Sequence, residues 1–514
     1  DPSPYWESAV RVTTGSNGLL SPALMLNAPI NDDWSFRLAA ESMRSDKNIT
    51  YSDPANSEYD EDSYDSIRGK LLYDPLSIPE LSVLFTISDV TDSPAVTAVN
   101  GDPADRHYDA TQSAIEYREN DVTSYILDIN YELTEEYALQ SITSRVDTKA
   151  YLDGSGTISG SAYLRDELRA DEDYSQEFRV IKQPGFSPLS GVAGVYYGNF
   201  KNDRDSLVTL EPEPIQSLSS KDQDTSLGLF AQARWEFNSK WTGIVGARYN
   251  RDTSDTEFED YLDKTKTTSE YESDSFLPNV GVIYSIDELS NIAFTVSQGY
   301  RSGFYEEGRA IDPEYLTSYE LAYRALLADE KLQLSANTFF YDWQDQQITV
   351  TQGSAQLPYT ENAGQSNVYG LELDARYYFD TVTIGSSIGL LKTELTDYKS
   401  ELTSINYSGN EFPEAPEFSG SLWANARIAE YWFVSGDLSG RSSAYATSDL
   451  SNTHDKVSGY GLVNLRAGYE RDIYSIVASV DNLFDKEYIT GRDTLGGVYV
   501  GDERTFAVTF SASY

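Results

Sequence analysis

Residues 502–514, DERTFAVTFSASY, decide the class of fold. From Phe506 to Tyr514 every second residue is apolar or aromatic, and the residues between them are Thr, Ala or Ser. A period of two is the spacing of a β-strand with one apolar face and one small, polar face. The segment therefore predicts a strand, and it makes an all-β protein the first hypothesis.

The same alternation recurs upstream, in residues 227–237, 317–325 and 368–379. In the first of these segments Phe230 is the one apolar residue on the polar face. A soluble sandwich buries its apolar face, whereas a membrane barrel turns that face to lipid, and both give this pattern. Periodicity alone leaves the two architectures open.

The connections between the expected strands separate the two. Tight turns, such as residues 31–33, 134–136 and 238–240, alternate with long acidic connections. We expect strands near residues 5–14, 18–30, 34–45, 65–75, 82–90, 121–133, 137–153, 168–183, 190–205, 224–237, 241–253, 274–286, 291–302, 315–327, 332–346, 366–379, 382–396, 416–428, 431–443, 457–470, 473–487 and 502–514. The long connections include 46–64, 91–120, 206–223, 254–273 and 397–415.

An even strand number with short turns on one side is typical of outer-membrane barrels. We therefore predict that residues 1–514 form one transmembrane antiparallel β-barrel of 22 strands. Its turns would be periplasmic, its long loops extracellular, and both termini periplasmic. Many strands exceed the ~9–11 residues that cross a bilayer, so the barrel is expected to rise above the outer leaflet.

Composition excludes several classes of protein. The formal net charge of −45 leaves no basic face for nucleic acid. No run of about 18 apolar residues occurs, so we expect no transmembrane helix. The two histidines, His107 and His454, fall in expected loops without a nucleophile motif. We therefore expect no enzyme and no cofactor, with an outer-membrane hydrolase as the weakest alternative.

Several segments resemble the TonB-dependent outer-membrane receptors of Gram-negative bacteria, in particular siderophore receptors. They are DNLFDKEY at 481–488, SQGYRSGF at 297–304, EYLTSYEL at 314–321, NAGQSNVYGLELD at 362–374 and YSQEFR at 174–179. Ala322 follows the third segment where Gly is commoner in the family. A terminal aromatic residue also resembles the closing strand of such barrels.

The resemblance implies an active transporter that imports a scarce, large solute, of which a ferric siderophore is the commonest. It implies partnership with the TonB energy-coupling complex through an N-terminal plug domain, which we expect upstream of residue 1 and outside this chain. Cobalamin, a sugar or a cationic complex remain open as substrates, because the acidic chain would repel anionic chelates. A barrel without a plug that serves as a scaffold or pore for a partner protein is the alternative.

Candidate ligand-binding residues combine aromatic rings with Arg and amides where expected strands enter extracellular loops, which suits a planar or anionic chelate. They are Tyr300, Arg301, Phe304, Tyr305, Trp343, Gln344, Arg441 and Tyr445. The alternative for the tyrosines is an outer aromatic girdle.

A second set of charged residues is expected to face the lumen, where it would contact a plug or line a permeation path. It comprises Arg37, Glu41, Arg234, Glu236, Arg248, Glu320, Arg324, Glu372, Asp374, Arg376 and Arg466. A generic salt-bridged interior is the alternative for each of them.

Acidic residues gather at Asp60, Glu61, Asp62 and Asp65. Carboxylates can hold Ca²⁺, but the spacing and turn Gly of a calcium loop are missing, so we expect a solvated loop and no metal site. Outer-membrane lipid and lipopolysaccharide are the remaining expected partners, with acidic loops facing outward beside them.

Overall fold

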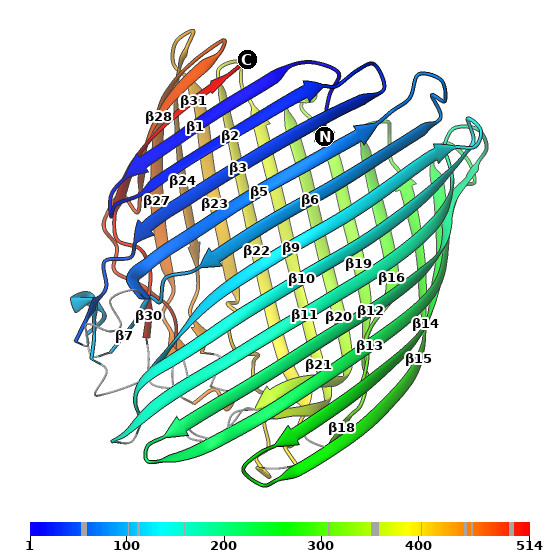
Figure 1. Ribbon diagram of the computed structural model, residues 1–514. Helices are drawn as coiled ribbons and strands as arrows, with labels where there is room; N and C mark the ends of the chain where they lie inside the picture. Colours follow the sequence, from blue (N-terminus) through cyan, green and yellow to red (C-terminus); the bar gives the residue numbers. More distant parts are fainter. Residues whose placement is uncertain are drawn as a thin grey trace.

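The computed structural model describes residues 1–52, 59–100, 102–109, 114–158, 160–306, 309–350, 359–401, 403–446, 450–453, 456–492 and 498–514. These residues form one closed antiparallel β-barrel (Figure 1). The barrel has 22 strands, which confirms the predicted number. The described residues contain no helix long and apolar enough to cross a membrane.

The barrel strands, in chain order, are β1 (Glu7–Gly15), β2 (Leu20–Pro29), β3 (Trp34–Asp46), β5 (Glu61–Tyr73), β6 (Leu81–Ser93), β9 (Ala114–Glu132), β10 (Tyr137–Ile158), β11 (Ser161–Lys182), β12 (Leu189–Leu210), β13 (Glu213–Glu236), β14 (Trp241–Asp260), β15 (Thr265–Ser285), β16 (Ser290–Arg301), β19 (Glu314–Leu327), β20 (Leu332–Val350), β21 (Tyr359–Tyr378), β22 (Val382–Asp397), β23 (Phe418–Arg427), β24 (Trp432–Arg441), β27 (Tyr460–Arg471), β28 (Tyr474–Asp481) and β31 (Thr505–Ser513).

Short elements lie between the barrel strands. They are β4 (Thr50–Tyr51), β7 (Ala98–Val99), a 3₁₀ turn (Pro103–Asp105), β8 (His107–Tyr108), β17 (Phe304–Glu306), β18 (Arg309–Ile311), β25 (Ala444–Tyr445), β26 (Lys456–Val457), β29 (Ile489–Arg492) and β30 (Val498–Val500). All of them lie in the connections at the end of the barrel opposite the chain termini. We call that end the loop end, and the other the terminus end.

The barrel closes where the last strand meets the first. β31 pairs with β1 from Ala9↔Ser513 to Gly15↔Ala507, and with β28 on its other side. The alternating segment at residues 502–514 thus supplies the closing strand. Closure pairs the backbone groups that an open sheet would leave at its edges, and lipid offers them no alternative partners.

The outer face of the barrel is apolar. Leu229 is 55% exposed, Phe510 42% and Leu422 52%, and large exposed side chains at alternate positions are what lipid contact requires. At the terminus end, aromatic pairs bound this face: Trp34 with Tyr73 and Trp241 with Tyr284, their ring centroids 4.5 and 4.7 Å apart. Trp34 and Trp241 each open a strand after a tight turn, as a membrane-interface girdle requires.

Strand length varies around the barrel and gives it a high side and a low side. Strands β10–β15 have 20 to 24 residues, and a separate long hairpin, β20–β21, has 19 and 20, whereas β23 and β24 have 10 each and β28 has 8. Because about 9–11 residues cross a bilayer, β9–β15 project beyond the membrane at the loop end (Figure 1). We call this projecting part the raised wall.

The raised wall corrects two expected loops. In place of the loop expected at 206–223, β12 continues to Leu210 and β13 begins at Glu213. In place of the loop expected at 254–273, only residues 261–264 turn between β14 and β15. Both faces of the wall above the membrane meet water, so its strands carry polar residues on both sides and lose the apolar alternation that marks a strand.

On the low side, the long connections pack into a cluster instead of extending as strands. Ile49, Val99, Tyr108, Ile115 and Val500 are each at most 5% exposed and form its core. Arg106 ties it together by donating to the carbonyls of Lys47 at 2.5 Å, Asn48 at 3.3 Å and Gly501 at 2.9 Å. We call these five residues and Arg106, with their contacts, the first loop cluster. It joins the connections β3–β5, β6–β9 and β28–β31.

Candidate functional site

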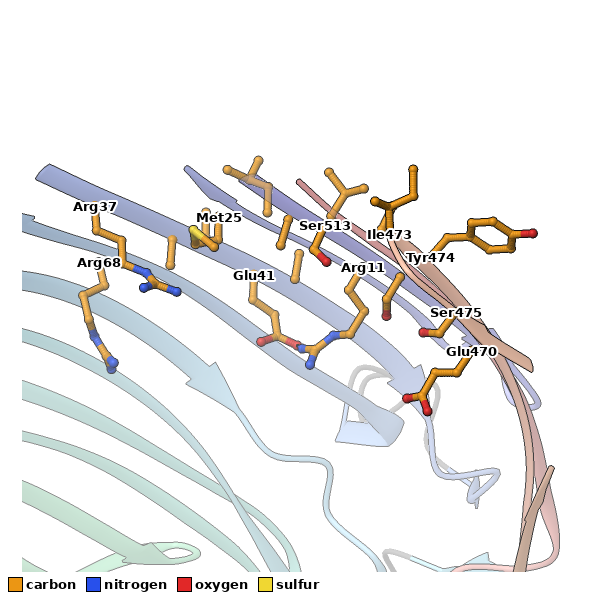
Figure 2. A pocket seen from close by; sticks show the side chains of 18 of the residues that line it. Arg11, Met25, Arg37, Glu41, Arg68, Glu470, Ile473, Tyr474, Ser475 and Ser513 are labelled. Carbon is orange, nitrogen blue, oxygen red and sulfur yellow. The ribbon is translucent and has the colours of Figure 1, made fainter. Parts of the chain in front are cut away.

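The strand register separates an inner from an outer face, because cross-strand partners lie on the same face. One row runs Ser475–Ser511–Arg11–Ala23–Glu41–Ser66 across six strands. In Figure 2 the labelled side chains of this row point to the interior, whereas Tyr474 points away from it. Residues that alternate with the exposed apolar side chains therefore face the lumen.

By this register, the residues predicted to face the lumen all stand on the inner face. Arg37 and Glu41 lie on β3, Arg234 and Glu236 on β13, Arg248 on β14, Glu320 and Arg324 on β19, Glu372, Asp374 and Arg376 on β21, and Arg466 on β27. Their predicted role, contact with a plug or a permeating solute, stays a prediction.

At the terminus end the inner wall lines an open cavity of about 980 Å³ (Figure 2). Its charged lining is nearly balanced, unlike the chain as a whole. The basic lining residues are Arg11, Arg37, Arg68, Arg427 and Arg471, and the acidic ones are Glu41, Glu430, Glu470 and Asp472. Arg11 pairs with Glu41 at 2.6 Å and Arg427 with Glu470 at 3.2 Å.

The first residues of the chain lie beside this cavity, against the inner wall. The Asp1 carboxylate is 2.7 Å from Lys70 Nζ, and Arg37 donates to the Asp1 carbonyl at 3.3 Å. Asn27, fully buried, holds the same segment through its side chain, which donates to the Tyr5 carbonyl at 2.6 Å. The chain thus enters β1 from inside the barrel, which the sequence did not reveal.

Further along the wall, aromatic rings support the inward cations. Arg248 lies over Tyr196 and Phe230, with its guanidinium carbon 5.2 and 5.7 Å from the ring centroids. Arg376 lies over Trp423 in the same way at 5.4 Å. Phe230 thus breaks the alternation of its strand because it packs against an inward arginine, a contact worth about 0.5–1 kcal/mol where it is exposed.

Inward carboxylates receive hydrogen bonds from neighbouring hydroxyls. Glu320 accepts from Ser318 at 3.0 Å and from Tyr341 at 3.2 Å, and Asp374 accepts from Ser387 at 2.5 Å. These contacts keep charged groups satisfied in a polar interior, where an unpaired charge facing lipid would be costly.

The eight candidate ligand-binding residues divide into two groups at the loop end. In the first group, one cross-strand row joins Tyr300, Tyr315 and Gln344, and the two tyrosine rings are 5.4 Å apart. Arg301 ends β16, Phe304 and Tyr305 belong to β17, and Tyr305 meets Tyr271 edge to face at 5.9 Å. Trp343 pairs in register with Leu316 and Ser366.

The second group, Arg441 and Tyr445, lies on β24 and β25. Arg441 donates to the Thr490 carbonyl at 3.1 Å and stacks over Tyr460 at 5.1 Å, and Tyr445 carries Lys456 over its ring at 4.8 Å. Both residues already make contacts between loops. Among the described residues no contact joins this group to Tyr300, so the structure does not bring all eight together.

Beside Tyr300 the inner wall holds a cleft of about 300 Å³. Phe200, Asp224 and Asp252 line it with Tyr300, whose hydroxyl lies 2.5 Å from Ser273 Oγ. Burial and the neighbouring carboxylates Asp222 and Asp252 raise the pKa of Asp224, against a hydrogen bond from Ser254 that lowers it. The cleft therefore favours hydroxyl-bearing or cationic groups.

A charged cluster on the inner face of the raised wall was not found from the sequence. The Glu167 side chain is fully buried and lies 2.7 Å from Arg165, 2.5 Å from Arg169 and 2.9 Å from Arg204. Burial alone would raise the pKa of Glu167, but hydrogen bonds from Arg204 and Arg165 outweigh it and lower the pKa to about 2. We call these four residues the rim cluster.

The acidic loop holds no metal site within the part of the chain that the structure describes. Asp60 accepts the backbone N–H groups of Lys47 at 3.1 Å and Ile49 at 2.8 Å, and burial raises its pKa. Asp65 and Glu61 pair with Arg44, and Asp62 pairs with Lys47. These carboxylates thus hold the loop at the mouth of the barrel.

The histidines expected in loops contribute no catalytic arrangement in the described residues. His107 Nδ1 lies 3.2 Å from Thr50 Oγ1 in the first loop cluster, and His454 is outside the described residues.

Comparison with known proteins gives a consistent result. The model for the TonB-dependent receptor-like β-barrel matches residues 33–483. The chain is 24% identical to the pesticin receptor of Yersinia pestis over 65% of this chain and 50% of that receptor. It is 23% identical to the metal-pseudopaline receptor of Pseudomonas aeruginosa, over 59% and 43% of the two. The chain thus spans about half the length of the curated relatives that it matches.

Among solved structures, the ferric yersiniabactin uptake receptor of Yersinia pestis superposes with a TM-score of 0.87 at 18% identity. The superposition covers all of this chain and 81% of the other. At this identity the likeness establishes the shared barrel fold.

Proposed function

Because the chain belongs to the TonB-dependent receptor-like β-barrel family, a family of receptors and not of enzymes, we propose that it is the barrel of an outer-membrane active transporter. Its terminus end would face the periplasm and its loop end the exterior. The solute that it imports would be a ferric siderophore or a similar metal chelate. Relatives whose names record a metal–pseudopaline complex, ferrichrome and ferrioxamine B support this class of solute.

The observation that carries the proposal is the position of Asp1. It lies inside the barrel, held by Lys70 and Arg37, next to a large cavity whose charges are nearly balanced. A plug domain joined to Asp1 would therefore begin within the lumen, where barrels of this width need filling. The balanced lining offers salt bridges to a plug without the repulsion that a chain of net charge −45 would otherwise impose.

Transport through a plug requires a coupling complex, since an occupied lumen does not open by itself. We propose TonB as that partner, acting on the plug from the periplasmic side. The polar inner wall would then form the passage, with the cleft beside Tyr300 and the stacked Arg248 among its surfaces.

The test is uptake of ⁵⁵Fe-labelled siderophores by iron-starved cells that carry or lack the full-length gene, with and without TonB. We expect uptake of at least one chelate, and this uptake should require both the full-length gene and TonB. Arg37→Asp, which reverses a charge in the terminus-end cavity, should reduce uptake, while Arg145→Asp, on the exposed outer face, should not. Uptake of labelled cobalamin or a sugar instead of iron would refute the substrate class. Equal uptake of every solute without the gene or without TonB would refute the transporter.

A further inference from the structure

The raised wall ends at β15, and the upper part of this strand has a hydrogen-bonded strand neighbour on one side only. β14 pairs with β15 from Thr265 to Tyr284, whereas β16 pairs only with Asn279–Ser285. Within the described ranges, no backbone hydrogen bond links residues 265–278 to anything on the β16 side. Pro278, where pairing stops, has no N–H to donate.

The opposite edge of the raised wall is covered. β9 pairs with β6 only as far as Asn120, but the first loop cluster packs over the residues beyond. Ile115 is 1% exposed there, and Tyr117 stacks on Tyr59 with ring centroids 4.9 Å apart. Natural proteins cover or blunt long sheet edges because an open edge is a template for another strand. β15 differs from β9: Tyr305 of β17 meets Tyr271 on its inner face, but among the described residues no strand pairs with the backbone groups of its upper edge.

The alternation of the antiparallel ladder identifies the free groups. Ser285 donates its N–H to Lys240 on the β14 side, so the odd-numbered residues of β15 face β14 and the even-numbered ones face the open side. The N–H and C=O groups of Lys266, Thr268, Glu270 and Glu272 thus point away from the sheet. Their side chains lie on the outer face with that of Phe276, which is 63% exposed.

An acidic cleft of about 650 Å³ adjoins this edge on the outer face and reaches it at Thr268 and Glu270. Its charged lining comprises Lys201, Lys221, Asp203, Asp222, Asp255, Glu257 and Glu270. By the strand register Asp222 faces the lumen, so two lysines and four carboxylates face the cleft with a net charge of −2. Lys266 beside the cleft pairs with one of these carboxylates, Glu257, at 2.5 Å. The cleft therefore suits the basic side chains of whatever lies along the edge.

We propose that the open edge of β15, residues 266–276, receives an extended segment of another protein as an added antiparallel strand. The segment carries Lys or Arg at alternate positions, whose side chains reach the acidic cleft. Backbone hydrogen bonds along the edge supply affinity, and the alternate side chains supply specificity. The observations that carry this binding surface are independent of transport, so it goes beyond the function proposed above.

A second copy of the chain does not fit this edge. Two copies in one membrane expose the same end, so a two-fold axis between them runs along the membrane normal. After that rotation both β15 strands still run in the same direction along the membrane normal. They therefore cannot become antiparallel neighbours. The occupant is consequently a different protein.

The experiment measures fluorescence anisotropy of a labelled decapeptide of alternating Thr and Lys added to the full-length protein in detergent micelles. We expect saturable binding, and much weaker binding of the matched Thr–Glu peptide. Thr268→Pro should weaken binding of the Thr–Lys peptide about tenfold, because it removes an edge donor and leaves a peptide carbonyl unpaired. Thr268→Ala keeps the N–H and should bind like the parent protein.

Two modified peptides make the test independent of any folding defect in the proline variant. One is N-methylated at every Thr and the other at every Lys. In an added strand the backbone N–H groups of only one residue type, Thr or Lys, point toward β15. The peptide that is N-methylated at that type should lose binding, and the other should keep it. Equal binding of both, or no binding of the unmodified peptide, would overturn the proposal. A dimer of the protein that Thr268→Pro dissociates would also overturn it, in favour of a second copy.

Discussion

Replacing Glu167 with Gln tests whether the rim cluster holds the raised wall together. The substitution keeps the size of the side chain and removes the one negative charge that three arginines share. Glu167 is buried among them, and Arg165 also pairs with Glu116 at 2.5 Å. A neutral amide would leave Arg169 and Arg204 close together without their common counter-charge.

The shift in the pKa of Glu167 gives the expected magnitude. Folding lowers it from 4.5 to about 2, and each pKa unit corresponds to about 1.4 kcal/mol. The ionised form therefore stabilises the wall by about 3 kcal/mol. Because the folded pKa is the lower one, this stabilisation is present above about pH 4.5 and is lost as the pH falls toward 2. Breaking a buried ion pair by removing one partner has a similar cost, about 3–5 kcal/mol.

The wall lies outside the membrane, so it can open without unfolding the barrel, and amide hydrogen exchange measures that opening. At pH 7 we expect amides of β11 and β12 near Glu167 to lose about a hundredfold in protection in Glu167→Gln. The matched control is Glu172→Gln on the same strand, whose carboxylate is 59% exposed and 3.9 Å from both Arg145 and Lys201. It should change exchange by less than about twofold.

The difference in exchange protection between the two variants tests whether the rim cluster stabilises the wall. If Glu167→Gln exchanges no faster than Glu172→Gln at pH 7, the rim cluster does not stabilise the wall. A parent protein whose protection at Glu167 stays constant from pH 5 to pH 3 would contradict the assigned titration in the same way.

Three further predictions concern the barrel as a whole. An epitope inserted in the turn at residues 261–264 should be labelled on intact cells, whereas one at 238–240 should be hidden, and equal labelling would reverse or abolish the proposed orientation. Phe510→Arg should impair membrane assembly by about 2–4 kcal/mol because it faces lipid, while Ser511→Arg, on the inner face, should assemble nearly normally in a heat-modifiability assay. This chain alone in a planar bilayer should give a large conductance that prefers cations, and added salt should reduce the preference through screening; a barrel that does not conduct would mean that the loops close the lumen.

The sequence alone predicted the barrel, its 22 strands and the faces of its membrane-spanning part. This succeeded because lipid on one side and a polar lumen on the other impose a period of two that every crossing strand must show. Residues such as Arg234 and Glu372 could be assigned to the inner face for the same reason. The tight turns between strands were equally clear, since each interrupts the alternation at one end of the barrel.

The sequence pattern did not predict the strand segments whose two faces both meet water. Residues 206–223 and 254–273 are mostly polar and show no sustained apolar alternation. Their pairing into the raised wall follows from the strands below them and not from any pattern of their own. The open edge of β15 is invisible for the same reason, because it depends on how far β16 accompanies its neighbour.

Contacts between distant residues were decided by the tertiary structure alone. Glu167 meets Arg204 because β11 and β12 pair in a particular register. A Cβ atom at Gly228 would lie 2.5 Å from the Arg248 guanidinium of the next strand, so a side chain there would displace that guanidinium. Asp1 reaches Lys70 across the inner wall. A local pattern specifies which face a side chain takes, whereas its neighbours on that face depend on the register of strands, which is set by the packing of the whole closed sheet.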